Sequence, residues 1–155
     1  MDIRIFFTII YTFTISLPPV VVGVATGAFL FSADLVRKIN LPIPIDFVRA
    51  ESYGSGTESN GAPTISFYLK VDVKNRHVIL VEDIVDKGHT LSCVIAHLKS
   101  KGGFYPFIPS TNVTLALFLI KCPNHFVVGY GMDFAELYRN LPYVGVLKPE
   151  HYYTA

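Results

Sequence analysis

The amino-acid sequence predicts an α/β fold in which helices cover both faces of a mostly parallel twisted sheet. Short apolar runs recur near residues 20, 44, 78 and 113, and segments of helical or loop character separate them. Most of these runs are continuous in Val, Ile and Leu, which is typical of strands buried on both faces. With 155 residues, of which 51% are hydrophobic, the chain has the size of one domain with a substantial core.

The first predicted strand leads directly into a predicted helix. Residues 20–24 form a valine-rich run that ends in Ala-Thr-Gly, which suits a tight turn. Apolar side chains then recur at three- and four-residue spacings over residues 29–39, which predicts a helix, and Asn40 and Pro42 end the pattern. Residues 43–50 are expected to form the second strand.

A polar segment follows the second strand. Residues 51–62 are rich in Gly and Ser, and a polar segment of this length is typical of a surface loop that can close over a site. We therefore expect a flexible lid loop at about residues 51–66.

The remaining elements complete the expected alternation of strands and helices. Alternating polarity at residues 66–73 predicts an exposed strand, and residues 77–81 form a buried apolar run. A helix is expected at residues 90–99, and residues 113–120 are the last buried strand. Because ligands of parallel sheets bind beyond the carboxyl ends of the strands, the turns that follow these buried strands should share one edge.

Charge and cysteine content exclude several classes of function. The chain has 13 basic and 12 acidic side chains and no block of basic residues, so it lacks the electrostatic footprint of a nucleic-acid-binding protein. Cys93 and Cys122 are too few for a disulfide scaffold and lack the paired spacing of a zinc site. Reduced thiols in the cytoplasm are therefore expected.

Two long stretches, residues 5–33 and 102–120, contain no charged side chain. The first could be read as a secretory signal or a membrane span, but Pro18 and Pro19 interrupt it. Prolines also break the second stretch, and its remaining apolar run suits a buried strand. We expect no membrane partner; a membrane-attached or secreted protein that uses residues 5–17 is the alternative.

Carboxylates and a turn suited to phosphate follow the third buried strand. Glu82 and Asp83 at its end are predicted to point to opposite faces, and Asp86 lies in the turn beyond. Residues 87–90, at a helix start, offer backbone N–H groups and a threonine hydroxyl, which suit a phosphate monoester. Together these features favour a phosphorylated sugar; the alternative is an acidic loop in which Thr90 is only an N-cap.

Four ordered motifs carry a resemblance to a known family. The run VILVEDIVDKGHTL, residues 78–91, resembles the segment of type I phosphoribosyltransferases that binds phosphoribosyl pyrophosphate (PRPP). Residues 20–39, 46–57 and 126–150 resemble hypoxanthine-guanine phosphoribosyltransferases, the plant-type members above all. The resemblance implies the type I phosphoribosyltransferase fold.

The resemblance also implies a domain boundary. It covers about residues 19–101 and 111–153. We therefore expect an atypical apolar segment at residues 1–18 ahead of a phosphoribosyltransferase domain at residues 19–155.

The implied activity belongs to purine salvage. The phosphoribosyl group of PRPP is transferred to hypoxanthine or guanine, which gives IMP or GMP and pyrophosphate, with Mg²⁺ as cofactor. Asp86 is the implied acid-base group near the purine N7, while Glu82 and Asp83 accept hydrogen bonds from the ribose hydroxyls. The residues implied to hold the 5′-phosphate are Lys87, Gly88, His89 and Thr90.

Further site residues are carried over from the same family motifs. The implied pyrophosphate ligands are Ala25, Thr26, Gly27 and Arg139. Asp133 is implied to hold Mg²⁺ together with Glu82 and Asp83, and Ser52 and Tyr53 lie on the lid. For the purine, Lys121 reads the exocyclic oxygen, Phe126 stacks on the ring and the Val127 backbone binds its edge. Without the resemblance, Lys121 is a surface lysine, Phe126 a core residue, and Asp133 and Arg139 solvated side chains.

Some features depart from the family pattern. Lys87 stands where relatives usually have threonine, and His89 where they often have lysine or asparagine. The chain is shorter than relatives ahead of the first motif and between Lys121 and Phe126, so we expect a sheet that lacks one cover and one strand. The alternative function is therefore a non-catalytic or weakly active nucleotide-binding protein of this fold. Relatives imply a homo-oligomer.

Overall fold

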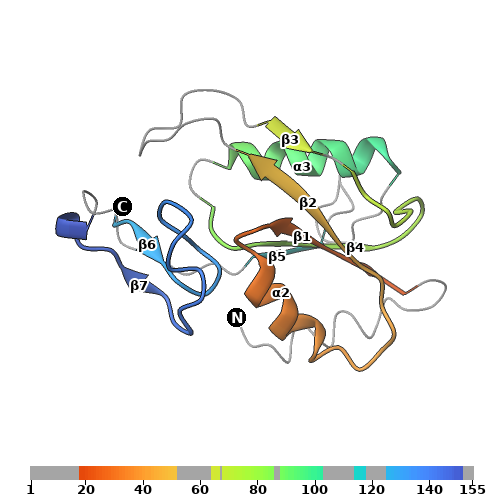
Figure 1. The fold of residues 1–155 in the computed structure, drawn as a ribbon. Coiled ribbons are helices and arrows are strands. Elements are labelled where there is room, and N and C mark those ends of the chain that lie inside the picture. Colours follow the sequence, from red (N-terminus) through yellow and green to blue (C-terminus); the bar gives the residue numbers. More distant parts are fainter. Residues whose placement is uncertain are drawn as a thin grey trace.

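The computed structural model of the protein describes residues 18–51, 64–66, 68–85, 88–102, 114–117 and 125–151. Within them, a five-stranded sheet has the order β3-β2-β1-β4-β5 (Figure 1). Four strands are parallel, namely β1 (Val20–Ala25), β2 (Ile45–Glu51), β4 (Val78–Glu82) and β5 (Thr114–Leu117). The short β3 (Thr64–Ser66) pairs antiparallel with β2 at one edge. The predicted α/β architecture is thereby confirmed.

Helices lie on opposite faces of the sheet because the central strands are apolar on both sides (Figure 1). Side chains alternate along β1 and β4, so Val22 and Leu80 pack with α3 (His89–Ser100). Val21 and Ile79 pack on the other face with α2 (Phe29–Val36). Because β1 and β4 pair in parallel, their carboxyl ends lie side by side.

A second, smaller unit lies beyond the carboxyl ends of the parallel strands (Figure 1). We call residues 125–151 the β6–β7 unit. It contains the antiparallel pair β6 (Val127–Val128) and β7 (Gly145–Val146), and it ends in the 3-10 helix η1 (Pro149–His151). Residues 129–144 connect the two strands, and we call their first part, the series of turns at residues 129–141, the Arg139 loop.

The predicted exposed strand at residues 66–73 is wrong in extent. The strand β3 ends at Ser66, and the described residues after it form bends and turns. The Asp46 carboxylate accepts the backbone N–H groups of Lys70 and Val71 at 2.6 and 3.0 Å. Those amides are therefore bound by a side chain instead of a neighbouring strand, and Val73 turns into the core with 2% of its surface exposed.

The predicted helices differ from the structure only at their ends. The first ends at Val36 rather than Ile39, since residues 37–38 form a turn. The second begins at His89 with Gly88 as its N-cap, in a left-handed conformation. Thr90 therefore lies in the first turn and is not the N-cap. No helix in the described part of the chain is both long and apolar enough to cross a membrane.

Candidate active site

Three loops from distant parts of the sequence meet at the carboxyl edge of the sheet. A methyl group placed on Gly27, in the turn after β1, would overlap the Asp83 carboxylate at the end of β4. A methyl group placed on Gly131, in the Arg139 loop, would overlap the Gly27 carbonyl oxygen. Glycine at position 27 thus lets the Asp83 carboxylate lie against the turn after β1, and glycine at position 131 lets the backbone of the Arg139 loop approach that turn.

The turn after β1 presents backbone to this edge. The Ala25–Thr26 peptide bond is cis, and Thr26 is exposed. Hydrogen bonds from Ala28 N to Val24 O (3.1 Å) and from Phe29 N to Thr26 O (3.1 Å) then start α2. The positive end of the α2 dipole consequently lies beside the predicted pyrophosphate loop of Ala25, Thr26 and Gly27.

The carboxyl groups of Glu82 and Asp83 lie close enough for each to affect the pKa of the other, and their orientation toward opposite faces stays a prediction. Asp83 follows the last residue of β4, where strand alternation no longer applies. Its Oδ1 accepts the Ile84 N–H at 2.9 Å, which turns the side chain back toward the site.

Both acids of this pair hold protons more tightly than usual. Burial, followed by the neighbouring Asp83 charge, raises the pKa of Glu82 to about 8. Burial also raises the pKa of Asp83, opposed in part by the Ile84 backbone hydrogen bond. The Glu82 Oε2 atom is buried without a hydrogen-bond partner in the described structure. Two desolvated carboxyl groups with unused acceptor capacity suit hydroxyl donors or a cation.

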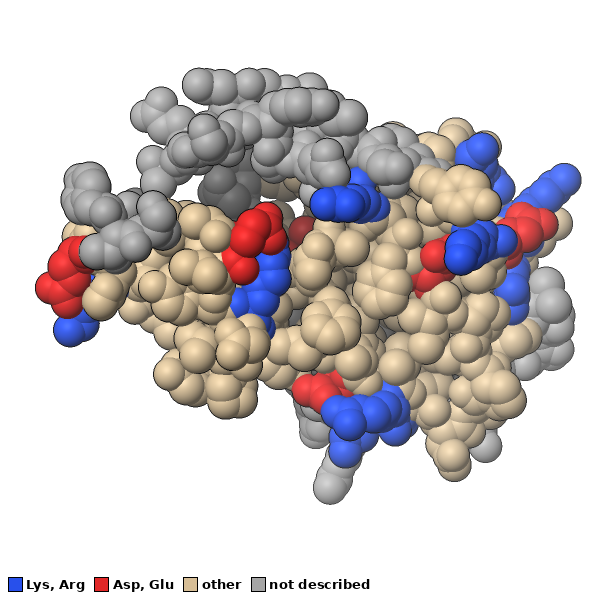
Figure 2. All heavy atoms as spheres, viewed as in Figure 1, with Lys and Arg blue, Asp and Glu red and all other residues tan. Residues whose placement is uncertain are grey.

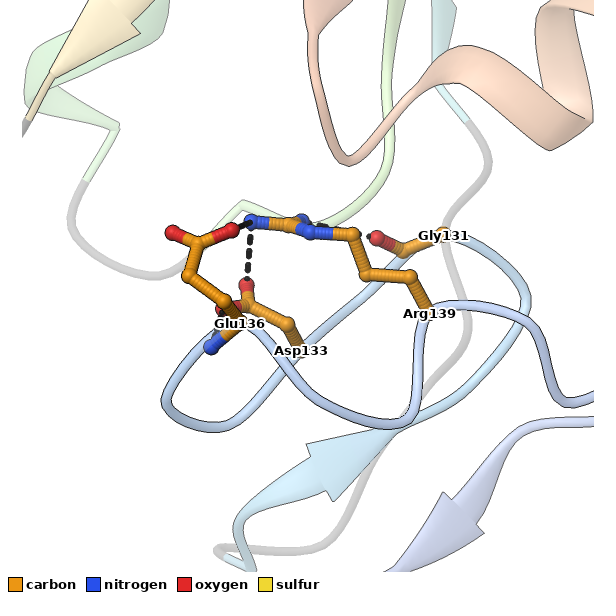
Figure 3. A network of polar contacts seen from close by, with 4 residues as sticks. All are labelled: Gly131, Asp133, Glu136 and Arg139. Carbon is orange, nitrogen blue, oxygen red and sulfur yellow. Dashed lines mark hydrogen bonds and ion pairs between the residues drawn. The ribbon is translucent and has the colours of Figure 1, made fainter. Parts of the chain in front are cut away.

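The Arg139 loop holds its arginine with three acceptors (Figure 3). Nη2 donates to Asp133 Oδ1 at 2.9 Å and to Glu136 Oε2 at 3.2 Å, while Nη1 donates to the Gly131 carbonyl at 2.9 Å. Asp133 and Arg139 are therefore paired, not independently solvated. In Figure 2, acidic and basic side chains adjoin each other where the β6–β7 unit meets the sheet.

Glu136 was not predicted as part of this network. The Asp133 Oδ2 atom accepts the Glu136 N–H at 2.9 Å, and both Ala135 and Glu136 have positive φ. This turn brings the Glu136 carboxylate back to Arg139. The pattern Asp-x-x-Glu, which often marks a side-chain-capped turn, is the sequence signal that could have indicated it.

Two predicted purine-binding residues, Phe126 and Val127, lie at the start of the β6–β7 unit. The half-buried Phe126 ring meets Phe134 edge to face, with 5.4 Å between the ring centroids. The Phe126 carbonyl accepts the Leu147 N–H at 2.8 Å, and Val127 pairs with Val146. The position of Phe126 is thus fixed by backbone as well as ring contacts.

The predicted 5′-phosphate segment begins α3. Gly88 has φ 74, and its carbonyl accepts the Ser92 N–H at 2.9 Å. His89 is exposed, and Thr90 is half-buried in the first turn. The other predicted site residues, which lie outside the described part of the chain, are Ser52, Tyr53, Asp86, Lys87 and Lys121.

The described residues contain no group of three or more His, Cys, Asp or Glu side chains gathered closely enough to hold a metal ion by themselves. The predicted Mg²⁺ ligands Asp133, Glu82 and Asp83 are nevertheless carboxylates, the donor type that Mg²⁺ prefers. Mg²⁺ usually binds one or two carboxylates together with substrate phosphates and water, so this donor set fits a metal that enters with its substrate.

Known proteins resemble this chain in sequence and in structure. The family model of the phosphoribosyl transferase domain matches residues 6–103 of this chain. The hypoxanthine-guanine phosphoribosyltransferase of Streptococcus pneumoniae is 39% identical over 150 residues, which cover 86% of this chain and 79% of the relative. A crystal structure of a hypoxanthine-guanine phosphoribosyltransferase from Bacillus anthracis has a TM-score of 0.74 and 33% identity, and covers 94% of this chain and 91% of that one.

A longer relative is also similar. The bifunctional protein TilS/HprT of Listeria innocua is 41% identical over 150 residues. The matched part covers 86% of this chain but spans only 22% of that relative's length. The similarity to this relative therefore concerns one part of a much larger protein.

Proposed function

The chain belongs to the hypoxanthine-guanine phosphoribosyltransferase family, and on that basis we propose that it transfers the phosphoribosyl group of PRPP to hypoxanthine or guanine. The products are IMP or GMP and pyrophosphate. The observation that carries the proposal is the close contact of Gly27 with Asp83 and of Gly131 with Gly27. These contacts bring the residues assigned to pyrophosphate and to ribose to one edge of the sheet.

The pyrophosphate group of PRPP is bound between two groups at this edge of the sheet. Backbone N–H groups of the Ala25–Gly27 turn bind one side of the pyrophosphate, and the Arg139 guanidinium binds the other. The guanidinium already has three acceptors, all from its own loop. Phosphate oxygens can replace Glu136, whose side chain is 84% exposed, more easily than the partly buried Asp133.

The carboxyl pair orients the ribose. Hydroxyl groups of the sugar donate to Asp83 and to the buried Glu82 Oε2, which then gains the partner that it lacks. Asp133, Glu82 and Asp83 are the residues that would hold Mg²⁺, which neutralises charge on the leaving pyrophosphate when it is bound. Carboxylates below the sugar also stabilise the positive charge that develops as pyrophosphate leaves.

The base is held against the β6–β7 unit. Phe126 stacks on the purine, the Val127 backbone binds its edge, and Lys121 binds the exocyclic oxygen. Asp86 exchanges a proton with N7 during transfer. The 5′-phosphate lies at the start of α3, on Lys87, Gly88, His89 and Thr90, where the helix dipole favours an anion. The lid residues Ser52 and Tyr53 close over the reacting centre and exclude water.

A direct assay tests this function. The purified chain, given PRPP, Mg²⁺ and either hypoxanthine or guanine, is expected to release pyrophosphate and form the corresponding nucleotide. Asp86→Asn should lower kcat by about 100-fold or more, because a general acid-base group is lost. Binding of IMP without turnover by the folded wild-type chain would instead favour a non-catalytic nucleotide-binding protein.

We also propose a cytoplasmic homo-oligomer as the working form. The exposed thiol of Cys93 suits a reducing compartment. Phe29 and Tyr143, which are 50% and 61% exposed, are apolar side chains that a partner subunit could cover. Light scattering of the purified protein and fractionation of cells that express it test the two statements separately.

A further inference from the structure

The β6–β7 unit is tied to the sheet domain by a side-chain hydrogen bond near the site. The Tyr130 hydroxyl donates to Asp34 Oδ2 across 96 residues of sequence. Tyr130 belongs to the Arg139 loop, whereas Asp34 lies on α2, the helix that starts just after Gly27. The bond therefore joins the Arg139 loop to the helix that follows the other predicted pyrophosphate loop.

Charge and burial keep this hydrogen bond intact over the working pH range. Burial, followed by the bond to Asp34, raises the pKa of Tyr130 to about 12, so the phenol remains a donor. The bond from Tyr130 and the contact with Arg37 lower the pKa of Asp34, so the carboxylate remains an acceptor. The side chain of Arg37 is 74% exposed and contacts Asp34 from within the same helix.

The next residue along the loop makes the backbone contact that defines the site. Gly131 approaches Gly27 so closely that no side chain fits between them. The Gly131 carbonyl also accepts the Arg139 guanidinium at 2.9 Å, and its N–H donates to the Arg139 carbonyl at 3.0 Å. Any shift of Tyr130 is thus transmitted through Gly131 to Arg139.

The backbone at Tyr130 indicates that its side chain has a use. Tyr130 has φ 54, between Gly129 at φ 92 and Gly131 at φ 104. Glycine would adopt this left-handed conformation without the strain that tyrosine incurs. A tyrosine here is best explained by the hydrogen bond that its hydroxyl makes to α2.

We propose that Tyr130 is a positioning residue that, through Asp34, sets the separation between the Ala25–Gly27 turn and Arg139, and so the width of the pyrophosphate site. The proposal rests on the proposed function, since it assigns pyrophosphate to that gap. It predicts that loss of the bond weakens binding of PRPP and pyrophosphate but leaves binding of the purine base nearly unchanged, because the Phe126 carbonyl is held by the Leu147 N–H, which lies outside the Arg139 loop.

The decisive variant is Tyr130→Phe, which removes only the hydroxyl. We expect the KM for PRPP, and for pyrophosphate in the reverse reaction, to rise about threefold to tenfold, the usual effect of one net hydrogen bond. The KM for hypoxanthine and kcat should change less than about twofold. The matched control is Arg37→Ala, which removes the other Asp34 partner and should leave every constant at its wild-type value.

Asp34 provides a second, independent test of the same bond. Asp34→Ala should raise the KM for PRPP as Tyr130→Phe does. Asp34→Asn, which keeps an acceptor oxygen, should retain most of the wild-type affinity for PRPP. The double variant of Tyr130→Phe and Asp34→Ala should be no weaker than the more affected single variant, since both remove one interaction.

The outcomes separate this proposal from the proposed function. An unchanged KM for PRPP in Tyr130→Phe, or an equal rise for PRPP and hypoxanthine, would overturn the positioning role. If the wild-type chain has no transferase activity, the proposed function fails, but amide hydrogen exchange still tests whether the Tyr130–Asp34 hydrogen bond holds the Arg139 loop. Tyr130→Phe should then speed amide exchange in residues 129–133, and unchanged exchange there would contradict the positioning role of Tyr130.

Discussion

The sheet domain and the β6–β7 unit are held together by different physical means. Valines of β1 and β4 in the sheet are almost completely buried, and the register follows from continuous apolar strands. The β6–β7 unit has only a few buried apolar side chains, and Leu137, Tyr143 and Val146 are more than half exposed. Among the described residues, four of the five non-glycine positions with positive φ lie in its Arg139 loop.

This difference separates stability from chemistry. Burial of apolar surface is non-directional, so it stabilises the sheet without defining the position of any polar atom. Hydrogen bonds and special backbone conformations are directional, and in the Arg139 loop they hold Asp133 and Arg139 in place (Figure 3). We therefore expect substitutions in the sheet to alter mainly the free energy of unfolding, and substitutions in the loop mainly activity.

The largest effect on stability is expected from the centre of the sheet. Leu80 in β4 has 0% of its surface exposed, and Leu80→Ala should lower the free energy of unfolding by about 2–5 kcal/mol. Urea denaturation measures this, with the exposed Val146→Ala as control at less than about 0.5 kcal/mol. A larger loss of stability in the control would contradict the comparison.

The largest effect on activity is expected at the contact between the two parts. Gly131→Ala places a methyl group on the Gly27 carbonyl, where the backbone cannot yield, at a φ of 104 that alanine tolerates poorly. Displacement of the loop should reduce kcat/KM for PRPP by about 100-fold. The urea midpoint should fall as well, because alanine at this positive φ is strained, but by less than in Leu80→Ala. Normal kinetics in Gly131→Ala would show that the close approach is not needed.

The buried carboxyl group of Glu82 makes the stability of the sheet depend on pH. Because the pKa of Glu82 is about 8 when folded and 4.5 in an unperturbed chain, the folded state retains a proton that the unfolded state loses. Its stabilising contribution is present below pH 4.5 and is lost as the pH rises through about 8. The ligand-free protein should therefore be less stable at pH 8 than at pH 5, by about 3–4 kcal/mol from this group.

Glu82→Gln isolates that contribution. The variant cannot titrate at this position, so its free energy of unfolding should depend less on pH between 5 and 8 than that of the wild type. Urea denaturation at the two pH values provides the comparison. Identical pH dependence in both proteins would assign the effect to other groups.

A smaller effect is expected from the geometry of Arg139. Arg139→Lys keeps the positive charge but loses the planar fork that contacts Asp133, Glu136 and the Gly131 carbonyl. We expect the KM for PRPP to rise about tenfold with little change in the unfolding free energy. Initial rates at varied PRPP measure it. A KM for PRPP equal to that of the wild type would mean that charge alone suffices.

Much of the fold could be predicted because its signals are local. The apolar runs at β1 and β4 and the helical spacing before Ile39 depend only on neighbouring residues, and the structure confirms these elements. The strand expected at residues 66–73 failed because the Asp46 carboxylate, a distant residue in sequence, takes the amides of Lys70 and Val71. Local alternation cannot reveal such a competitor.

The candidate site was predicted in parts. The motifs located Glu82, Asp83, Asp133 and Arg139 in the chain, but they did not show that burial raises the pKa values of the first two. The roles of Glu136 and Tyr130 were missed, because each depends on turns with positive φ at residues that do not normally favour it. Such conformations are imposed by surrounding contacts and leave only a weak trace in sequence.

The sequence by itself determined the parallel sheet, the order of its elements and the chemistry available beyond the strand ends. The spacing of apolar residues and the types of polar residue are properties of neighbouring positions in the chain, so they can be read without the fold. Only the tertiary structure decided which groups meet there. The Tyr130–Asp34 hydrogen bond, the Gly27–Gly131 approach and the raised pKa of Glu82 all arise between segments far apart in the chain or from burial that folding creates. These effects depend on distance and desolvation, which exist only once the chain has packed.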